Sequence, residues 1–272
     1  MSYIENWDQL VIDHHKQSEN KIIKKEQDDF WEDKVEGFIP PELPDYNDPT
    51  LSFLLSSLLP QSSVLDLGGG AGRLSIPLAQ NNYVVTIIDS SKAMINAAGK
   101  HANHLKLNNV KTRHSTWEEY KNENFDYIIC AHVMYGISNI KNFILKMLSS
   151  VNSNVIIIMY DHSPQSHLAD IWELYYFEQR INLPGITELE NVITELNIKY
   201  KLYDLDDYNL PVFDDFESLL NSVISQIFIT PNKDNISKLS DILKNYMTID
   251  KDQFIFPFNL KRKLKVITID KV

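Results

Sequence analysis

The sequence predicts an α/β fold in which helices cover both faces of a mostly parallel sheet. From Ser62 onward, short apolar segments alternate with longer helical stretches, which is typical of stacked βαβ units. The short segments are rich in β-branched residues along their whole length, as expected for strands buried on both faces. The predicted strands are residues 63–67, 83–89, 110–114, 125–131 and 154–160.

Helical segments are predicted between and beyond these strands. The serine pair at 90–91 precedes a helix at 92–106, and Asn139 or Ile140 precedes one at 141–148. The remaining predicted elements are helices at 165–180 and 186–196, a strand at 200–205, insertion helices at 213–228 and 236–246, and a closing strand at 261–270.

The N-terminal part has a different character. Residues 1–60 are predicted to be largely helical, with scattered aromatic side chains, a proline-rich break at 39–44 and a second helix at 49–59. We therefore expect a helical cap at residues 1–61 and a main domain at residues 62–272, with a helical insertion at about 209–258.

Charge and composition narrow the range of partners. The chain has 272 residues, of which 43% are hydrophobic, so it is long enough to bury a full core. Its formal net charge of -11 disfavours nucleic acids and anionic membranes, because both are bound through clustered Lys and Arg. We expect a small-molecule partner, no nucleic acid and no membrane, and the sequence does not indicate an oligomeric state.

Cysteine usage and the N-terminus indicate a cytoplasmic protein. Cys130 is the single cysteine, so no internal disulfide can form, and no His/Cys cluster has the spacing of a zinc site. The first 30 residues lack the apolar core of a signal peptide, and no apolar run approaches the ~20 residues needed to span a bilayer. We expect no metal, and Cys130 as a small buried hydrophobe.

A glycine-dense turn follows the first predicted strand and opens a helix. Glycines at such a turn allow a sharp bend and a close ligand approach, and the helix N-terminus presents free N–H groups. Asp89 ends the second strand, where an acid can bind both hydroxyls of a ribose. Arg73 occupies the position of the third glycine of a dinucleotide fingerprint, which weakens the case for NAD, and no Walker A lysine follows.

The pattern Asp66-x-Gly68-x-Gly70-x-Gly72, with Asp89 after the second strand and Phe125-Asp126 opening the fourth, resembles class I S-adenosylmethionine-dependent methyltransferases. The resemblance is close over residues 62–161. It implies a Rossmann-like three-layer sandwich with a seven-stranded sheet whose last strand is antiparallel. It also implies S-adenosylmethionine as the cofactor and methyl transfer as the reaction.

The same resemblance implies roles for individual residues. The glycine turn packs on the methionine part of the cofactor, and Asp89, next to Ser90, holds the ribose. Met94 either packs on the adenine or belongs to the helix core. The remaining expected cofactor contacts are Asp66, Gly68, Gly69, Gly70, Gly72, Thr116, Trp117 and Ala131. Thr116-Trp117 replaces the acid and small residue that usually read the adenine edge in the family.

Candidates for chemistry follow the fourth and fifth strands. His132 is the expected catalytic residue, because a histidine titrates near neutrality and can remove a proton from an acceptor; a structural role is the alternative. The expected substrate contacts are Trp31, Tyr135, Asp161 and His162. His167 is expected on the surface of the next helix.

Three other functions remain open at this stage. The chain is either a methyltransferase for a small molecule, with the acceptor atom undetermined, or a binding protein for S-adenosylmethionine without transferase activity. A methyltransferase acting on RNA or protein is a further alternative, which a basic groove beside the pocket would favour. A nicotinamide-dependent oxidoreductase is the last alternative function.

Overall fold

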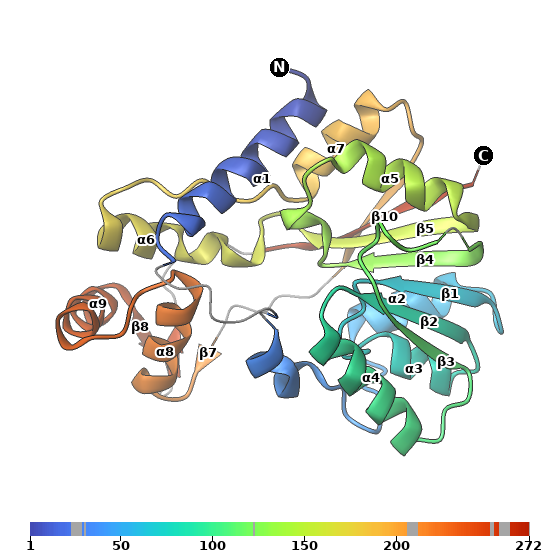
Figure 1. Cartoon of the computed structure of the whole chain (residues 1–272), viewed down its shortest axis with the longest axis horizontal. Helices are drawn as coiled ribbons and strands as arrows, with labels where there is room; N and C mark the ends of the chain where they lie inside the picture. Colours follow the sequence, from blue (N-terminus) through green and yellow to red (C-terminus); the bar gives the residue numbers. More distant parts are fainter. Residues whose placement is uncertain are drawn as a thin grey trace.

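A seven-stranded sheet lies at the centre of the molecule, as Figure 1 shows for the computed structural model. The structure describes residues 1–22, 29, 31–121, 123–205, 212–250, 253–255 and 262–271. The strand order is β3-β2-β1-β4-β5-β10-β6. The strands are β1 (Ser63–Leu67), β2 (Val84–Asp89), β3 (Val110–His114), β4 (Phe125–Ala131), β5 (Val151–Tyr160), β6 (Lys201–Leu205) and β10 (Leu264–Asp270).

The pairing confirms the predicted topology. Strands β3, β2, β1, β4 and β5 are parallel to one another, and β10 runs antiparallel between β5 and β6. The order of the strands reverses between β1 and β4, and in open α/β sheets ligands bind at such a switch point, beyond the carboxyl ends of the strands.

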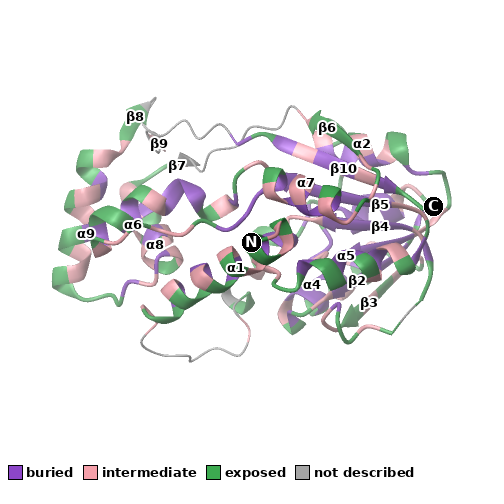
Figure 2. Cartoon of the chain, turned by 90° about the horizontal axis from the view of Figure 1, so that it is seen from above, coloured by how far each residue is buried: buried purple, intermediate pink, exposed green. Residues whose placement is uncertain are grey.

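Helices cover both faces of the sheet and make it a three-layer sandwich. On one face, α1 (Tyr3–Glu19), α5 (Ile140–Ser149) and α7 (Ile186–Glu195) share a buried apolar core with the sheet. On the other, α2 (Pro49–Ser57), α3 (Ser75–Gln80) and α4 (Lys92–His104) share a second one. Figure 2 shows the buried residues concentrated along the strands between these helices.

A smaller lobe with its own core stands beside the sheet (Figure 1). It contains α6 (Ala169–Tyr176), α8 (Phe216–Gln226), α9 (Lys233–Tyr246) and a small sheet in the order β7-β9-β8. The sequence predicts α8 and α9 but not that sheet. Its strands, Val212–Phe213, Gln253–Ile255 and Thr248–Asp250, are too short to show a periodic pattern.

The predicted helix at 165–180 is wrong in its extent. A 3₁₀ turn, Pro164–Leu168, precedes α6, and α6 ends at Phe177, whose φ of 56° is left-handed. His167 is also misplaced by the prediction: it is buried in this turn, with Nδ1 2.6 Å from the carbonyl oxygen of Pro164. Burial is the main reason that its pKa falls to about 4.

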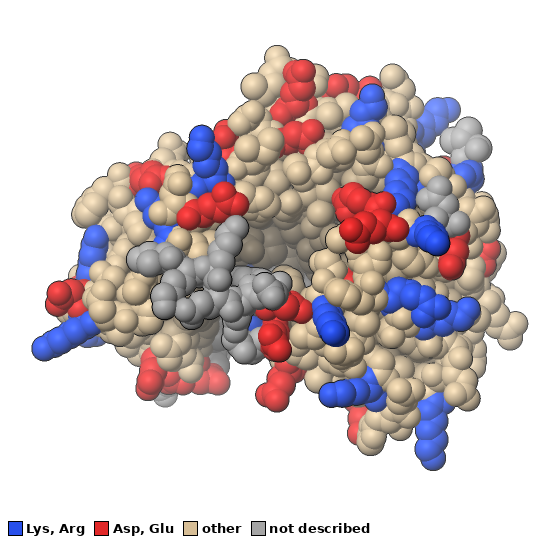
Figure 3. Space-filling view, viewed as in Figure 1, with Lys and Arg blue, Asp and Glu red and all other residues tan. Residues whose placement is uncertain are grey.

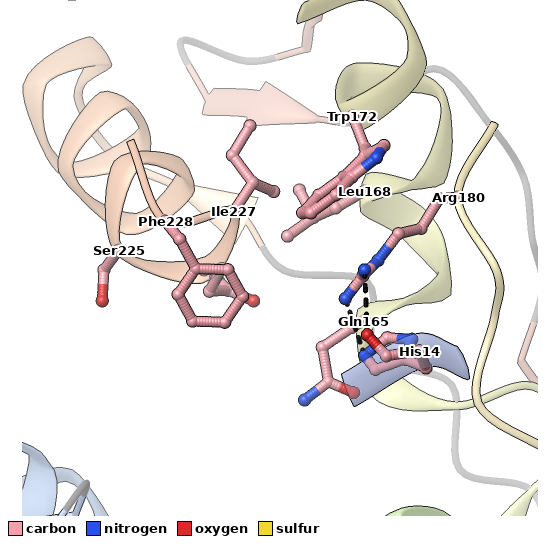
Figure 4. Close-up of a pocket in the computed structure, with 9 residues that line it drawn as sticks. His14, Gln165, Leu168, Trp172, Arg180, Ser225, Ile227 and Phe228 are labelled. Carbon is pink, nitrogen blue, oxygen red and sulfur yellow. Dashed lines mark hydrogen bonds between the residues drawn. The ribbon is translucent and has the colours of Figure 1, made fainter. Parts of the chain in front are cut away.

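The segment after α6 makes hydrogen bonds to α1 beside a small cavity of about 80 Å³ (Figure 4). Arg180 donates to Nε2 of His14 at 2.8 Å and to the hydroxyl of Ser18 at 2.7 Å, and its guanidinium lies 3.9 Å from the centre of the Trp172 ring. Because a guanidinium only donates, Nε2 of His14 accepts, and Nδ1–H donates to the carbonyl of Ile181 at 2.6 Å. His14 is therefore neutral.

The rest of the N-terminal part crosses to the opposite face. A 3₁₀ helix, η1 (Glu32–Phe38), lies against α4, and α2 follows after the proline-rich segment. The proposed division into a cap at 1–61 and a main domain at 62–272 stays a prediction. In the described part of the chain, no helix is both long and apolar enough to cross a bilayer.

Candidate functional site

A cavity of about 470 Å³ opens where β1, β2 and β4 end. The face seen in Figure 3 is hollowed between the sheet and the lobe. The cavity brings together most of the residues selected from the sequence: Trp31, Asp66, Gly68, Gly69, Gly70, Asp89, Ser90, Met94, Thr116, Trp117, Ala131 and His132. Its size lies within the range of ~300–1,000 Å³ usual for small-molecule sites.

The glycine turn forms the floor of the cavity. A Cβ on Gly68 would lie 2.4 Å from Cγ2 of Val133, so only glycine lets the turn pass beneath the loop after β4. Gly70 has a φ of 55°, and the nearest atom to a Cβ there would be Sδ of Met94 at 3.8 Å. A side chain at Gly70 would extend into open space, which is the space that a ligand needs.

Asp89 ends β2 with its carboxylate held in a fixed orientation. One oxygen accepts from the N–H of Gly70 at 2.9 Å and the other from the N–H of Ser91 at 2.8 Å. A carboxylate has about four acceptor positions, so roughly two remain for hydroxyls of a ligand in the cavity. Burial raises the pKa of Asp89, and the two N–H donors oppose that rise.

Asp66 lies beneath the turn and is almost fully buried. Burial raises the pKa of Asp66 to about 6, although the hydroxyl of Ser75 donates to the carboxylate at 2.6 Å and Arg73 lies near it. A Cβ on Gly69 would lie 2.6 Å from the carboxyl group of Asp66. The acid therefore supports the turn from within the fold and also reaches the cavity.

The wall beyond β3 is largely aromatic and apolar. Trp117 is 5% exposed and donates its ring N–H to the carbonyl of Phe143. Nζ of Lys146 lies 4.7 Å from the centre of the Trp117 ring. Met94 is buried between Ala71 and Ala97, so it belongs to the helix core and lines the cavity at once. Glu118, which the sequence reasoning missed, supplies an acid to this wall.

His132 stands at the end of β4 with a φ of 59°. Its ring centre lies 4.9 Å from that of Tyr160, and its Nδ1 lies 3.2 Å from the hydroxyl of Tyr135. Burial, with the nearby Arg73 and Arg262, lowers the pKa of His132 to about 4, so the imidazole is neutral at physiological pH.

Four selected residues do not line the cavity. Gly72, with a φ of 91°, packs the turn against Ile76. Tyr135 is buried behind His132 and accepts the N–H of Tyr160 at 2.7 Å. Asp161 accepts the N–H groups of Lys263 and of His162, and so joins β5 to the segment before β10. The geometry gives no support to a substrate contact for Tyr135, Asp161 or His162.

Other lining residues are not among the site residues selected from the sequence, although Phe38, like Trp31, is an aromatic residue of the N-terminal segment that could line a pocket. Phe38 packs edge-on against Trp31, with ring centres 5.4 Å apart, and both lie over the cavity from η1. The others are Leu67, Ala71, Arg73, Leu74, Ile88, Ser115, Glu118, Val133, Ile137 and Phe143. Leu67, Ala71, Arg73, Ile88, Ser115, Glu118 and Val133 adjoin the motif positions and were within reach of sequence reasoning, whereas Phe143 comes from α5.

A family model described as a methyltransferase domain matches residues 58–203. The chain belongs to this family. The matched region contains the glycine turn, Asp89 and His132, and it leaves α1, α8 and α9 outside.

Curated proteins match a shorter region. The ubiquinone biosynthesis O-methyltransferases of Rickettsia typhi and Rickettsia akari are 36% and 34% identical to this chain over 99 and 104 residues. These matches cover 35% and 37% of this chain and 39% and 40% of the relatives. The chain thus matches about two fifths of the length of these relatives.

Solved structures share the fold at low sequence identity. A cyclopropane-fatty-acyl-phospholipid synthase-like protein from Lactobacillus casei aligns with a TM-score of 0.57 at 15% identity, over 88% of this chain and 98% of that one. A putative methyltransferase from Bacillus halodurans has a TM-score of 0.56 at 11% identity, over 82% and 98%. These likenesses establish the Rossmann-like methyltransferase fold.

Proposed function

We propose that this chain transfers a methyl group from S-adenosylmethionine to an oxygen atom of a small-molecule acceptor. One observation carries the proposal: a single cavity brings together a side-chain-free turn at Gly70, the oriented carboxylate of Asp89 and the neutral imidazole of His132. Family membership supports the reaction, and the name of the curated relatives supports oxygen as the accepting atom.

The residues present fit the proposed cofactor. Gly70 leaves open the space that a side chain would fill, and Asp89 keeps acceptor positions for the two ribose hydroxyls. Met94, Thr116 and Trp117 offer a largely apolar wall for the adenine. Once bound, the cofactor supplies a methyl group on a positively charged sulfur, and holding a nucleophile in line with that bond provides much of the acceleration.

The lining of the cavity supports a small aromatic acceptor. Trp31, Phe38 and Phe143 provide apolar surface, and Arg73 is the one Lys or Arg among the described lining residues. Three acids, Asp66, Asp89 and Glu118, share that lining, which disfavours a polyanion such as RNA. The proposed acceptor is a small molecule and not a nucleic acid, and the proposed location of the protein is the cytoplasm.

Release of S-adenosylhomocysteine tests the proposal. Wild-type protein is incubated with S-adenosylmethionine and each of catechol, 4-nitrocatechol and 3,4-dihydroxybenzoate. We expect release with at least one acceptor, and a loss of about 100-fold or more in Asp89→Ala, which removes the ribose contacts. A melting temperature of the wild-type protein that rises with NAD but not with S-adenosylmethionine would overturn the cofactor assignment.

A further inference from the structure

The hydroxyl of Tyr135 lies between two groups whose hydrogen-bonding roles can be assigned. Its oxygen accepts the backbone N–H of Tyr160 at 2.7 Å and lies 3.2 Å from Nδ1 of His132. The side chain of Tyr135 is 5% exposed. A backbone N–H only donates, so the phenol proton of Tyr135 has to be directed elsewhere.

Nδ1 of His132 is the acceptor available to that proton. Burial raises the pKa of Tyr135, so the phenol keeps its proton at physiological pH. Among the described residues, Nδ1 of His132 is the hydrogen-bond partner of Tyr135 other than the N–H of Tyr160. The network therefore assigns the phenol as donor and Nδ1 as acceptor, because the opposite assignment leaves a buried hydroxyl proton without a partner.

This assignment fixes the other nitrogen of the imidazole. A neutral imidazole carries one proton, so an accepting Nδ1 places that proton on Nε2. The surroundings of the ring keep it neutral. Tyr160 lies against it and Tyr135 stacks at 6.3 Å; burial is the main cause of its lowered pKa, and Arg73 and Arg262 lower it further. No described residue makes a hydrogen bond to Nε2, and Nε2 is not among the buried unpartnered atoms, so it is accessible from the cavity that His132 lines.

Because Nε2 already carries a proton, it cannot remove one from the methyl acceptor. Nε2–H instead donates a hydrogen bond, and the strongest partner for an N–H donor is a negatively charged oxygen. Arg73 lines the same cavity, lies near enough to His132 to lower its pKa, and also pairs with Asp48 at 3.3 Å. Both groups favour an oxygen that has lost its proton before it reaches the site.

We infer that His132 donates Nε2–H to the attacking oxygen of an acceptor that binds as an anion, and that Tyr135 is the positioning residue that holds this tautomer. The acceptor class is an acidic hydroxyl compound, such as an acidic phenol or a carboxylic acid. The inference rests on the proposed function and replaces the expectation that His132 is a base.

The step balances without a proton passing to the protein. The new bond joins the acceptor oxygen to the methyl carbon while the bond from that carbon to sulfur breaks. The electron pair of the broken bond stays on sulfur, so the anion and the sulfonium are both neutralised. His132 keeps its proton throughout.

The tautomer can be read directly, without turnover. A proton–nitrogen correlation spectrum of histidine-labelled protein distinguishes the two neutral tautomers from the imidazolium, and His132→Gln assigns the signal. We expect the Nε2–H tautomer at neutral pH. The Nδ1–H tautomer would place a basic lone pair in the cavity and overturn the inference, as would an imidazolium.

Tyr135→Phe tests the positioning role. Loss of the phenol donor is expected to move the His132 signals toward a mixture of tautomers. The matched control is Tyr83→Phe, because Tyr83 is also buried and donates to the carbonyl of Leu58, away from the cavity. His132 signals that move equally in both variants, or in neither, would contradict a specific role for Tyr135.

The ionisation of the acceptor is tested with two probes. Because 4-nitrocatechol is more acidic than catechol, the rising limb of kcat/KM against pH is expected to move down the pH scale with 4-nitrocatechol. A limb at the same pH for both probes would indicate that a protein group takes the proton, and would overturn the inference. Absence of turnover with every acceptor would contradict the proposed function, while the tautomer measurement would still stand.

Discussion

Gly70 links the two acids of the site, because its N–H donates to Asp89 while the turn around it covers Asp66. Its φ of 55° is reached easily by glycine but is strained for a β-branched residue. Gly70→Val adds this strain and fills the space above the turn. We expect the affinity for S-adenosylhomocysteine to fall by at least about tenfold, as measured by calorimetry.

Gly99→Ala is the control for that substitution. Gly99 lies inside α4, where a Cβ would lie 3.6 Å from Oγ1 of Thr112, an ordinary contact. Alanine there is expected to stabilise the helix by about 0.5–1 kcal/mol and to leave the affinity unchanged. Equal affinities for Gly70→Val and wild type would show that the turn does not face the ligand.

Sequence reasoning reached the residues whose role follows from local chemistry. Asp66, Asp89 and the glycines are recognisable because a turn between a strand and a helix needs these residue types. Asp161 was selected by the same reasoning, yet its carboxylate joins two segments of backbone that are distant in sequence. That pairing depends on β10 lying beside β5, which no local pattern reveals.

At the scale of elements, α1 supports the loop that carries His132. Trp7 donates its ring N–H to the carbonyl of Ile137 at 2.9 Å, and Asp8 accepts the N–H of Ile140 at 3.1 Å. Ile137 itself lines the cavity. The N-terminal helix therefore shapes the site from behind the loop.

Trp7→Phe is expected to loosen this loop. The lost hydrogen bond costs about 1 kcal/mol of the free energy of unfolding, and hydrogen exchange at the amide of Ile137 should become faster. Tyr83→Phe is the matched control, because Tyr83 is also buried and its hydroxyl makes a hydrogen bond to the carbonyl of Leu58, in the core on the opposite face of the sheet. If exchange at Ile137 is the same in both variants, α1 does not hold the loop.

The start of α4 gives a second prediction at this scale. The hydroxyl of Ser91 accepts the N–H of Met94 at 3.1 Å and donates to Asp29 at 2.8 Å. Ser91→Ala removes both interactions, so we expect urea denaturation to show a loss of about 1 kcal/mol. An unchanged free energy of unfolding would contradict the capping role.

The elements missed by sequence reasoning are those set by tertiary contacts. The end of α6 at Phe177 carries no glycine or proline, and the chain turns there so that Arg180 reaches His14 on α1. The strands β7, β8 and β9 are two or three residues long and, within the described part of the chain, pair with one another. Neither feature leaves a periodic signal, whereas β1, β2, β4 and β5 have five to ten residues and are mostly apolar and buried.

For the whole molecule, three buried neutral histidines make stability depend on pH. His14, His132 and His167 each have a pKa lowered from 6.5 to about 4, mainly by burial. The unfolded chain binds more protons than the fold between these values, so their contribution is complete above pH 6.5 and is lost as the pH falls toward 4. Asp66, with a pKa raised to about 6, offsets part of this loss.

We therefore expect the free energy of unfolding to fall from neutral pH to about pH 5, with a slope of about 1.4 kcal/mol per pH unit for each proton taken up. Urea denaturation at several pH values measures this slope. His14→Gln removes one of the three groups and should reduce the slope. An identical slope in wild type and His14→Gln would show that His14 does not titrate on unfolding.

We propose that the cavity beyond β1 and β2 binds the cofactor through its glycine turn and Asp89. Calorimetric titration of S-adenosylhomocysteine into wild type, Asp89→Ala and Asp204→Ala tests it most directly, since Asp204 is an exposed carboxylate on β6. We predict binding to wild type and to Asp204→Ala with equal affinity, and at least about tenfold weaker binding to Asp89→Ala. No binding to wild type, or equal affinities for all three proteins, would contradict the claim.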